Sequence, residues 1–309
     1  MKHIAKSSTN ARKISVDTLR IAIYHHDPQV RLDVLGLMCE SRKAITPISK
    51  IEMDILREFI PLNMNCTSPE FRQTFCTHIS RLLFRLRGIL YAKYRSYKSS
   101  IAYLDKLTST EDSKKYAATR TEADESLDSI EHGKQFLYWL IKHIETSLYP
   151  GASYQRVATS LRLLSTLIKI FGVTELPVPT GFGDQPVDFP FRVPVGTPQL
   201  TKVLIDTLMN PFDFNRVQAF DILSQFPNPL PDIESRQDAQ HLLWWGLDNV
   251  VSTRAGESDS GAMVFRLVFT KYVKELGYDL YPERDIKQKV PPTVELAPGT
   301  KYTMIDFSL

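Results

Sequence analysis

Apolar side chains recur at every third or fourth position over most of this chain, and polar residues fill the positions between them. That period places the apolar residues on one face of an α-helix, whereas a half-buried strand would alternate at every second position. We therefore predict an all-α fold. The expected helices cover residues 16–26, 30–40, 49–60, 71–90, 133–148, 154–171, 198–209, 215–225, 236–253 and 261–276.

The segment from Phe59 to Arg87 contains a predicted helix end, a polar turn and the start of a second helix. Pro61 is expected to end the first helix, because proline lacks a backbone donor and clashes with the preceding turn. Ser68 and Pro69 form a typical helix start, a side-chain cap followed by a residue that fits the first turn. We expect the second helix to bend or end between Gly88 and Lys93, because a straight helix would turn that lysine toward the core.

A turn followed by a helix with an early arginine recurs five times along the chain. The arginines are Arg31, Arg72, Arg156, Arg216 and Arg266, with separations of 41, 84, 60 and 50 residues. Because 84 is about twice the roughly 40- to 47-residue period of HEAT-type helix pairs, we predict an irregular HEAT/armadillo-like helical solenoid of about five pairs. The arginines are expected to form a structural ladder, each tying its helix start to a neighbouring repeat. The alternative is a basic surface along the stacked helices.

Two segments interrupt the predicted solenoid, which covers residues 1–281. Residues 105–131 hold eight acidic and four basic residues and few large apolar ones, which predicts a solvated or disordered acidic insertion. It could fold back over the basic stretch before it, although an inert insertion is favoured. Residues 171–200 are rich in proline and glycine and predict a long loop, and residues 282–309 predict an irregular tail.

Composition is ordinary for a water-soluble protein, with 43% hydrophobic and 24% charged residues and a net charge of +3. Three cysteines, Cys39, Cys66 and Cys76, are typical of buried thiols in a reducing compartment rather than of a disulfide framework. No run of 18 apolar residues predicts a membrane span, and the first residues lack the apolar stretch of a signal peptide. A cytoplasmic location is expected. The basic, serine-rich start also resembles a mitochondrial transit peptide, which is the less favoured interpretation.

The charge distribution is more informative than the net charge. No acidic residue occurs between Phe71 and Leu104, where tyrosines interleave with basic residues. Positive charge beside aromatic rings is the pattern of a surface that follows phosphates and stacks bases. The candidate RNA-binding residues are Arg81, Arg85, Arg87, Lys93, Arg95 and Lys98, the first three of which are expected to reach solvent. A solvated helix face followed by a basic loop is the alternative interpretation, and the slightly favoured one.

Residue patterns of catalytic or metal sites are missing or incomplete. The pair Gly181 and Gly183 lacks the third glycine of a dinucleotide loop. Cys66, Cys76 and His78 do not have the spacing of zinc ligands. The sequence contains no glycine-rich strand–loop–helix of a methyl-donor site, so we expect no catalytic residues, no metal, no cofactor and no small-molecule substrate.

The string PLNMNCTSPEFRQ, with HHDPQVRLDVLGLMCES before it and YPGASYQRVATSLRLL and SDSGAMVFRLVFTKYV after it, resembles the thyroid-adenoma-associated protein family. The resemblance covers roughly residues 16–273, and its most specific block contains Asn63, Asn65, Phe71, Arg72 and Gln73. Family members are large HEAT-like scaffolds, several times longer than this chain. The family's later Arg-Ser-Ala-Gly-Leu-Pro-type block does not occur here. The chain therefore resembles one segment of such a scaffold, or a truncated gene model.

This resemblance implies a non-catalytic regulatory subunit that positions tRNA for a partner, a tRNA 2′-O-methyltransferase that modifies the anticodon loop. The implied partners are therefore that methyltransferase and tRNA, without a membrane or a small-molecule substrate. Two alternatives remain open at this stage. One is a protein–protein adaptor without RNA contact, and the other is an inactive fragment of such a scaffold.

Overall fold

The computed structural model describes residues 3–4, 12–13, 15–40, 47–105, 113–173, 193, 195–254 and 256–276. A short antiparallel hairpin, β1 (His3–Ile4) and β2 (Arg12–Lys13), precedes ten helices in this part of the chain. The helices are α1 (Val16–Ile23), α2 (Pro28–Cys39), α3 (Lys50–Asn63), α4 (Pro69–Leu104), α5 (Ser113–Ser147), α6 (Tyr154–Phe171), α7 (Pro198–Thr207), α8 (Asp213–Ser224), α9 (Arg236–Val250) and α10 (Glu257–Leu276).

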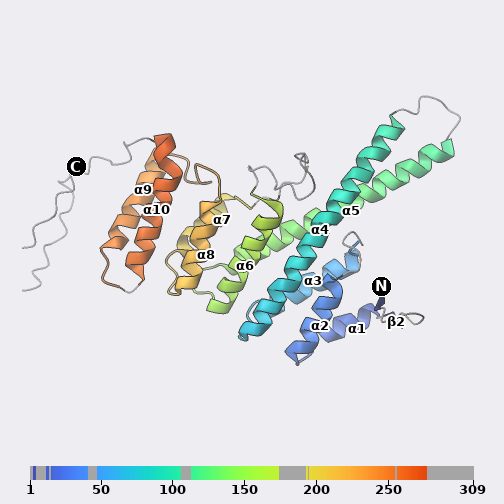
Figure 1. Ribbon diagram of the computed structural model, residues 1–309, viewed down its shortest axis with the longest axis horizontal. Helices are drawn as coiled ribbons and strands as arrows, with labels where there is room; N and C mark the ends of the chain where they lie inside the picture. Colours follow the sequence, from blue (N-terminus) through green and yellow to red (C-terminus); the bar gives the residue numbers. More distant parts are fainter. Residues whose placement is uncertain are drawn as a thin grey trace, which may run out of the picture.

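The helices stack side by side in an elongated array, with α1 to α3 at one end and α9 with α10 at the other (Figure 1). The even-numbered helices contact one another in chain order from α2 to α10, and α1, α3, α5 and α7 do the same behind them. Their buried apolar side chains form one continuous hydrophobic core. The prediction of an all-α helical solenoid built from helix pairs is confirmed.

Local sequence signals account for most helix starts. Asp27, Ser68, Ser153 and Thr197 each accept a backbone N–H of the following helix, and proline follows three of these caps directly. These contacts satisfy donors that the first helical turn leaves without partners. Pro61, however, lies inside α3, which ends three residues later than predicted.

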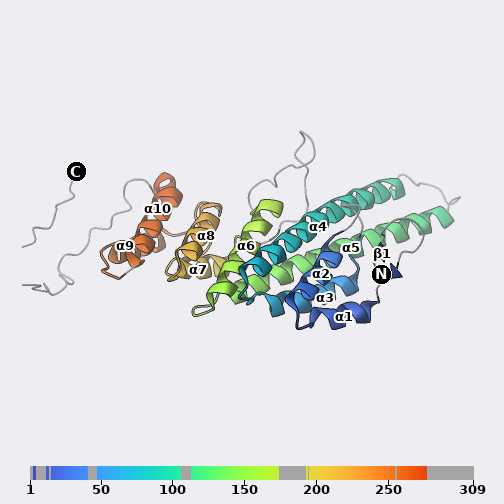
Figure 2. The same ribbon diagram turned by 60° about the horizontal axis from the view of Figure 1, so that its bottom comes forward.

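The longest helices differ most from prediction. Helix α4 is continuous over 36 residues, so the bend expected between Gly88 and Lys93 is wrong. The distal halves of α4 and α5 extend together beyond the other helices (Figures 1 and 2). Among the described helices, α5 packs along α4 in this extension (Figures 1 and 2). Lys93 is half-buried rather than enclosed in the core.

The acidic segment also forms more structure than expected. From Ser113 onward it is helical, as the first half of α5, although most of its side chains are exposed as predicted. Its buried positions, Ala123, Ser126, Ile130 and Gly133, alternate at three- and four-residue spacing, and three of them are small, which allows two helices to approach closely. A Cβ atom on Gly133 would lie only 2.7 Å from Cδ2 of Leu90 on α4.

Some predicted features lie outside the described residues. They include residues 174–192 of the predicted proline- and glycine-rich loop and the whole tail, residues 282–309. Within the described part of the chain, no helix is long and apolar enough to cross a membrane. The same residues contain no cluster of His, Cys, Asp and Glu that could hold a metal ion.

Candidate nucleic-acid interface

The connector between α3 and α4, residues 64–68, joins three consecutive helix pairs. At the end of α3, the buried Asn63 accepts a hydrogen bond from Nε of Arg31 on α2 at 3.0 Å. Two residues later, Oδ1 of Asn65 accepts from Oγ of Ser153 at 2.7 Å and from Nε of Arg156 at 3.3 Å, both at the start of α6. The two motif asparagines therefore hold this connector from opposite sides.

Phe71 and Arg72 complete the packing around this connector. The ring of Phe71 stacks on Phe75 in the core, and the guanidinium of Arg31 lies 5.6 Å from its centroid. Of the five residues singled out in this block, Asn65 and Gln73 are exposed, and Gln73 alone lines a groove between α4 and α6.

Three of the early arginines share one hydrogen-bond pattern, which we call the turn lock. In each, Nη1 donates to the backbone carbonyls six and five residues earlier, in the turn that precedes its own helix. The turn lock comprises Arg31 with His25 and His26 (2.7 and 3.1 Å), Arg72 with Cys66 and Thr67 (2.9 and 2.7 Å), and Arg216 with Asn210 and Pro211 (3.1 and 3.4 Å). Backbone carbonyls just beyond a helix end have no donor within the helix. The guanidinium N–H groups donate to these carbonyls instead.

The predicted ladder is therefore only partly right. The arginines of the turn lock chiefly bind their own turn, although Arg31 also donates to Asn63 of α3 at 3.0 Å and Arg216 lies 3.7 Å from Asp259 of α10. Arg156 contacts Asn65 instead of its own turn. Arg266 lies in the middle of α10 and stacks over the ring of Phe220, so it does not belong to an early helical turn.

The candidate RNA-binding cations of α4 separate into buried and exposed groups. Arg85 is 5% exposed and donates to the carbonyls of Met38 and Pro47 at 3.2 and 3.0 Å, so the expectation that it reaches solvent is wrong. Burial lowers the pKa of Arg85 and of the half-buried Arg87. Arg81 is 55% exposed and forms an ion pair with Glu40.

The distal cations of α4 lie against tyrosines of the same helix. The guanidinium of Arg95 is 5.8 Å from the Tyr91 ring, and the ammonium of Lys98 is 4.7 Å from the Tyr94 ring. Both cations are exposed. These two tyrosine rings are thus partly covered by cations, which reduces the area available for stacking bases.

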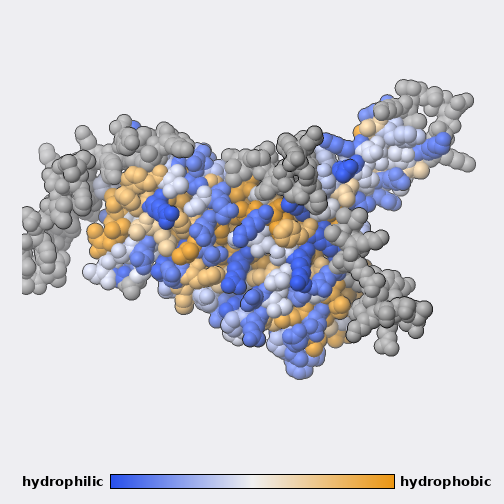
Figure 3. Space-filling model, in the orientation of Figure 1, coloured by the Kyte–Doolittle hydropathy of each residue, from blue (hydrophilic) through white to orange (hydrophobic). Residues whose placement is uncertain are grey.

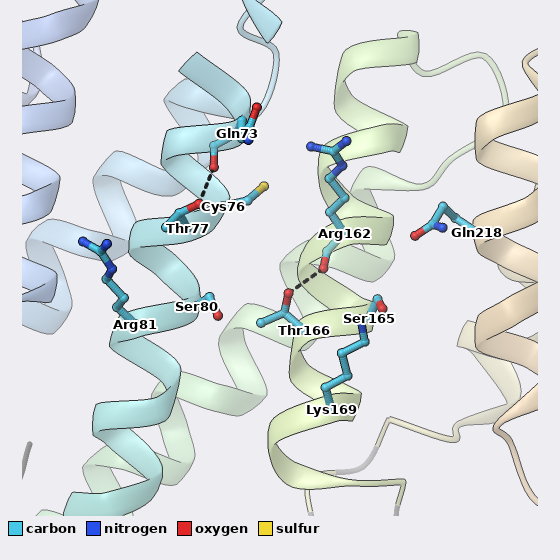
Figure 4. Close-up of a pocket in the computed structure, with 10 residues that line it drawn as sticks. All are labelled: Gln73, Cys76, Thr77, Ser80, Arg81, Arg162, Ser165, Thr166, Lys169 and Gln218. Atoms are coloured by element: carbon cyan, nitrogen blue, oxygen red, sulfur yellow. Dashed lines mark hydrogen bonds between the residues drawn. The ribbon is translucent and has the colours of Figure 1, made fainter. Parts of the chain in front are cut away.

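A groove that the sequence did not predict lies beside the cations of α4. The groove encloses about 370 Å³ between α4, α6 and α8 (Figure 4). Exposed Arg162 and Lys169 of α6 line one side of it and Gln73 of α4 the other, while Arg81 lies at its edge with its guanidinium turned toward Glu40 (Figure 4). Its remaining lining is mostly small and polar, consisting of Cys76, Thr77, Ser80, Ser165, Thr166 and Gln218.

Charge on this face is strongly one-sided. Helix α4 holds seven Lys and Arg residues against Glu70 alone, and α6 holds three basic residues and no acidic one. Figure 3 shows strongly hydrophilic side chains gathered over the neighbouring α4 and α6. The acidic half of α5 packs along the distal half of α4, and its Asp128 pairs with Lys50 of α3 at 3.3 Å. We call the exposed cations Arg81, Arg95, Lys98, Arg162 and Lys169, together with the half-buried Arg87, the basic strip.

The groove provides binding groups rather than a reactive nucleophile. Burial raises the pKa of the Cys76 thiol to about 11, although Arg162 and Arg72 act in the opposite direction. The thiol is therefore protonated near neutral pH, and a protonated thiol is a poor nucleophile. What this arrangement can do chemically is bind an anion with guanidinium, ammonium and hydroxyl donors.

Known proteins resemble this chain over most of its length. It is 26% identical to the tRNA (32-2′-O)-methyltransferase regulator THADA of Canis lupus familiaris over 81% of this chain, and equally to that of Homo sapiens. It is 27% identical to the tRNA (32-2′-O)-methyltransferase regulator trm732 of Schizosaccharomyces pombe over 79% of this chain. The chain spans only 12–15% of the length of these three relatives.

Among solved structures, an engineered protein covers 83% of this chain and 97% of its own length, at 13% identity and a TM-score of 0.29. The family model described as "Trm732, TPR repeats" matches residues 2–217, more than half of the sequence. Its repeats are named TPR rather than HEAT, and both are helix-pair repeats. The chain belongs to this Trm732 TPR-repeat family.

Proposed function

We propose that this chain is a non-catalytic segment of a tRNA methyltransferase regulator and that it contacts tRNA through the basic strip. The relatives from dog, human and fission yeast are all named as regulators of a tRNA (32-2′-O)-methyltransferase. In this proposal the methyltransferase is the partner that carries out the reaction, and this chain contributes contacts with tRNA rather than a reacting group. A cytoplasmic location is part of the proposal.

The observation that carries tRNA contact is the excess of positive charge on two adjacent helices. Most surface cations of this chain have acidic neighbours, such as Lys142 beside Glu145 and Lys202 beside Asp232. The exposed Arg95 and Lys169, in contrast, have no ion pair within the described residues. Cations without acidic partners are available to displace the counterions of a phosphate backbone.

Binding of this kind depends steeply on salt, because each neutralised phosphate releases counterions. The logarithm of the affinity is expected to fall with the logarithm of the salt concentration by roughly 0.7 to 0.9 per phosphate contacted. An apolar docking groove would be much less sensitive to salt. The salt dependence therefore distinguishes tRNA contact from protein docking.

The test is binding of whole tRNA to the purified chain at low and physiological salt, measured by fluorescence anisotropy. The variant Arg95→Glu, Arg162→Glu, Lys169→Glu reverses three exposed charges of the basic strip. The control Lys142→Glu, Lys202→Glu, Arg254→Glu makes the same change of net charge at positions that are 67%, 67% and 82% exposed. We expect the first variant to bind at least tenfold more weakly with a shallower salt dependence, and the control to change little. Equal loss in both variants would overturn the proposed surface.

A protein–protein adaptor is the second candidate function. Large apolar side chains are exposed at the end of the array that holds α1, among them Ile21 at 74% and Tyr24 at 61%. Absence of tRNA binding by the well-folded chain, together with salt-insensitive binding of the methyltransferase, would favour this function.

A further inference from the structure

Phe84 lies exposed in the middle of the basic strip. Its side chain is 58% exposed, whereas Phe71 and Phe75 of the same helix are buried. A helical period of 100° per residue places Phe84 on the same face as Arg81 and Arg87, its neighbours three residues away on either side. An exposed ring between two arginines has no role in the hydrophobic core.

The residues one turn away leave this ring accessible. Positions four residues before and after a helical residue are its neighbours along the axis, and here they are Ser80 and Gly88. Both are too small to cover a phenyl ring. Within the described residues, Phe84 has neither an aromatic partner nor a cation over its face, unlike Tyr91 and Tyr94.

The groove ends close to this ring. Ser80 and Arg81 line the groove, and Phe84 follows them by one helical turn, a rise of about 6 Å for four residues. A strand whose phosphates are bound by Lys169 in the groove would thus bring its next bases near Phe84. The exposed ammonium of Lys169 favours such a phosphate-bearing strand over an apolar protein surface, which would bury this cation without a partner charge.

We propose that Phe84 is a stacking platform for an unpaired base of the RNA bound by the basic strip. This inference rests on the proposed function and adds a preference to it. Phosphate contacts alone do not distinguish paired from unpaired RNA, whereas a base can stack on an aromatic ring only if it is unstacked from its own helix. The strip should therefore prefer RNA with exposed bases, such as a hairpin loop.

The experiment compares two RNA probes at one salt concentration, an anticodon stem-loop oligonucleotide and a fully paired duplex of the same length. We expect Phe84→Ala to weaken stem-loop binding about tenfold, the size of one lost base–aromatic stack. Duplex binding and the salt dependence should change little. Phe269→Ala removes a partly exposed ring from α10 and serves as the matched control.

A second variant reports stacking directly. Phe84→Trp should retain stem-loop affinity, and its added fluorescence should be quenched when the stem-loop binds, relative to the parent chain with Trp139, Trp244 and Trp245. Unfolding midpoints of all variants should match the parent, because the ring is exposed.

The outcomes separate this inference from the function on which it rests. Salt-dependent tRNA binding that the three-charge variant loses, but that Phe84→Ala leaves unchanged, would overturn the stacking platform and keep the proposed function. Equal weakening of stem-loop and duplex by Phe84→Ala would also overturn it. No RNA binding by the parent chain would overturn both.

Discussion

Arginines at the helix starts and arginines along the basic strip have the same side chain but opposite surroundings. Arg72 at the start of α4 donates to two carbonyls of the turn before it. Arg95, on the same helix, is exposed and contacts only the Tyr91 ring among the described residues. An arginine stabilises this fold where it lies beside backbone carbonyls that have no donor within a helix. An arginine away from such carbonyls remains available to a ligand.

The physical basis is desolvation. A guanidinium offers five donors in a rigid fork, and in the turn lock two carbonyls accept from one nitrogen. Removing the arginine leaves those carbonyls without partners, at a cost of roughly 1–3 kcal/mol for each that is buried. An exposed cation has water as a replacement partner, so its removal costs roughly 0–1 kcal/mol.

The largest effect is expected at Arg85, the buried cation of α4. Arg85→Ala should lower the free energy of unfolding by about 3 kcal/mol, because the carbonyls of Met38 and Pro47 lose their donor. Urea unfolding followed by circular dichroism measures this change. Arg95→Ala is the control and should change stability by less than about 0.5 kcal/mol. Similar losses in the two variants would contradict the division between buried and exposed arginines.

A smaller loss in the free energy of unfolding is expected when a turn-lock arginine is replaced by lysine, which keeps the charge but not the planar guanidinium. Arg72→Lys should cost about 1–2 kcal/mol in the same unfolding measurement, because an ammonium does not reproduce the reach and planarity of the guanidinium. Affinity for tRNA should be unchanged, since Arg72 lies outside the basic strip. A loss of tRNA affinity without a loss of stability would instead make Arg72 a ligand contact.

The sequence predicts the solenoid because capping residues and apolar periodicity act locally. Asp27 and Ser68 mark helix starts whatever the rest of the chain does. The length of α4 could not be predicted in this way, because its extension packs on Ala123, Ser126 and Gly133. Small residues of this kind add little to a hydrophobic pattern, although they let two helices approach closely.

The candidate site was predictable only in part. The basic stretch of α4 is visible as a run without acidic residues, but the burial of Arg85 depends on carbonyls contributed by residues about forty positions earlier. The other wall of the groove contains Arg162 and Lys169 of α6. In the sequence, α6 is separated from α4 by the whole of α5. Residues 154–171 contain no acidic residue. This absence indicates a shared basic surface only once α6 is known to pack against α4.

Burial affects the protonation state of a histidine more than that of an arginine, because imidazole is the weaker base. Burial lowers the pKa of both Arg85 and His143. Arg85 keeps its proton, since the pKa of a guanidinium stays far above neutrality even when burial lowers it. His143, which stacks on Trp139 and lies near Arg156, has an ordinary pKa of 6.5, so it is neutral in the folded chain near pH 7.

The smallest effect is therefore a pH dependence of stability. As the pH falls below about 6.5, the unfolded chain binds a proton at His143 before the folded chain does, so stability decreases until the pH passes the lower folded-state pKa. Urea midpoints at pH 7.5 and 5.5 should differ less in His143→Phe, which keeps a ring over Trp139, than in the parent. His78, whose pKa burial also lowers, should leave part of the difference in place. An unchanged difference in the variant would show that His143 is hydrated and titrates normally.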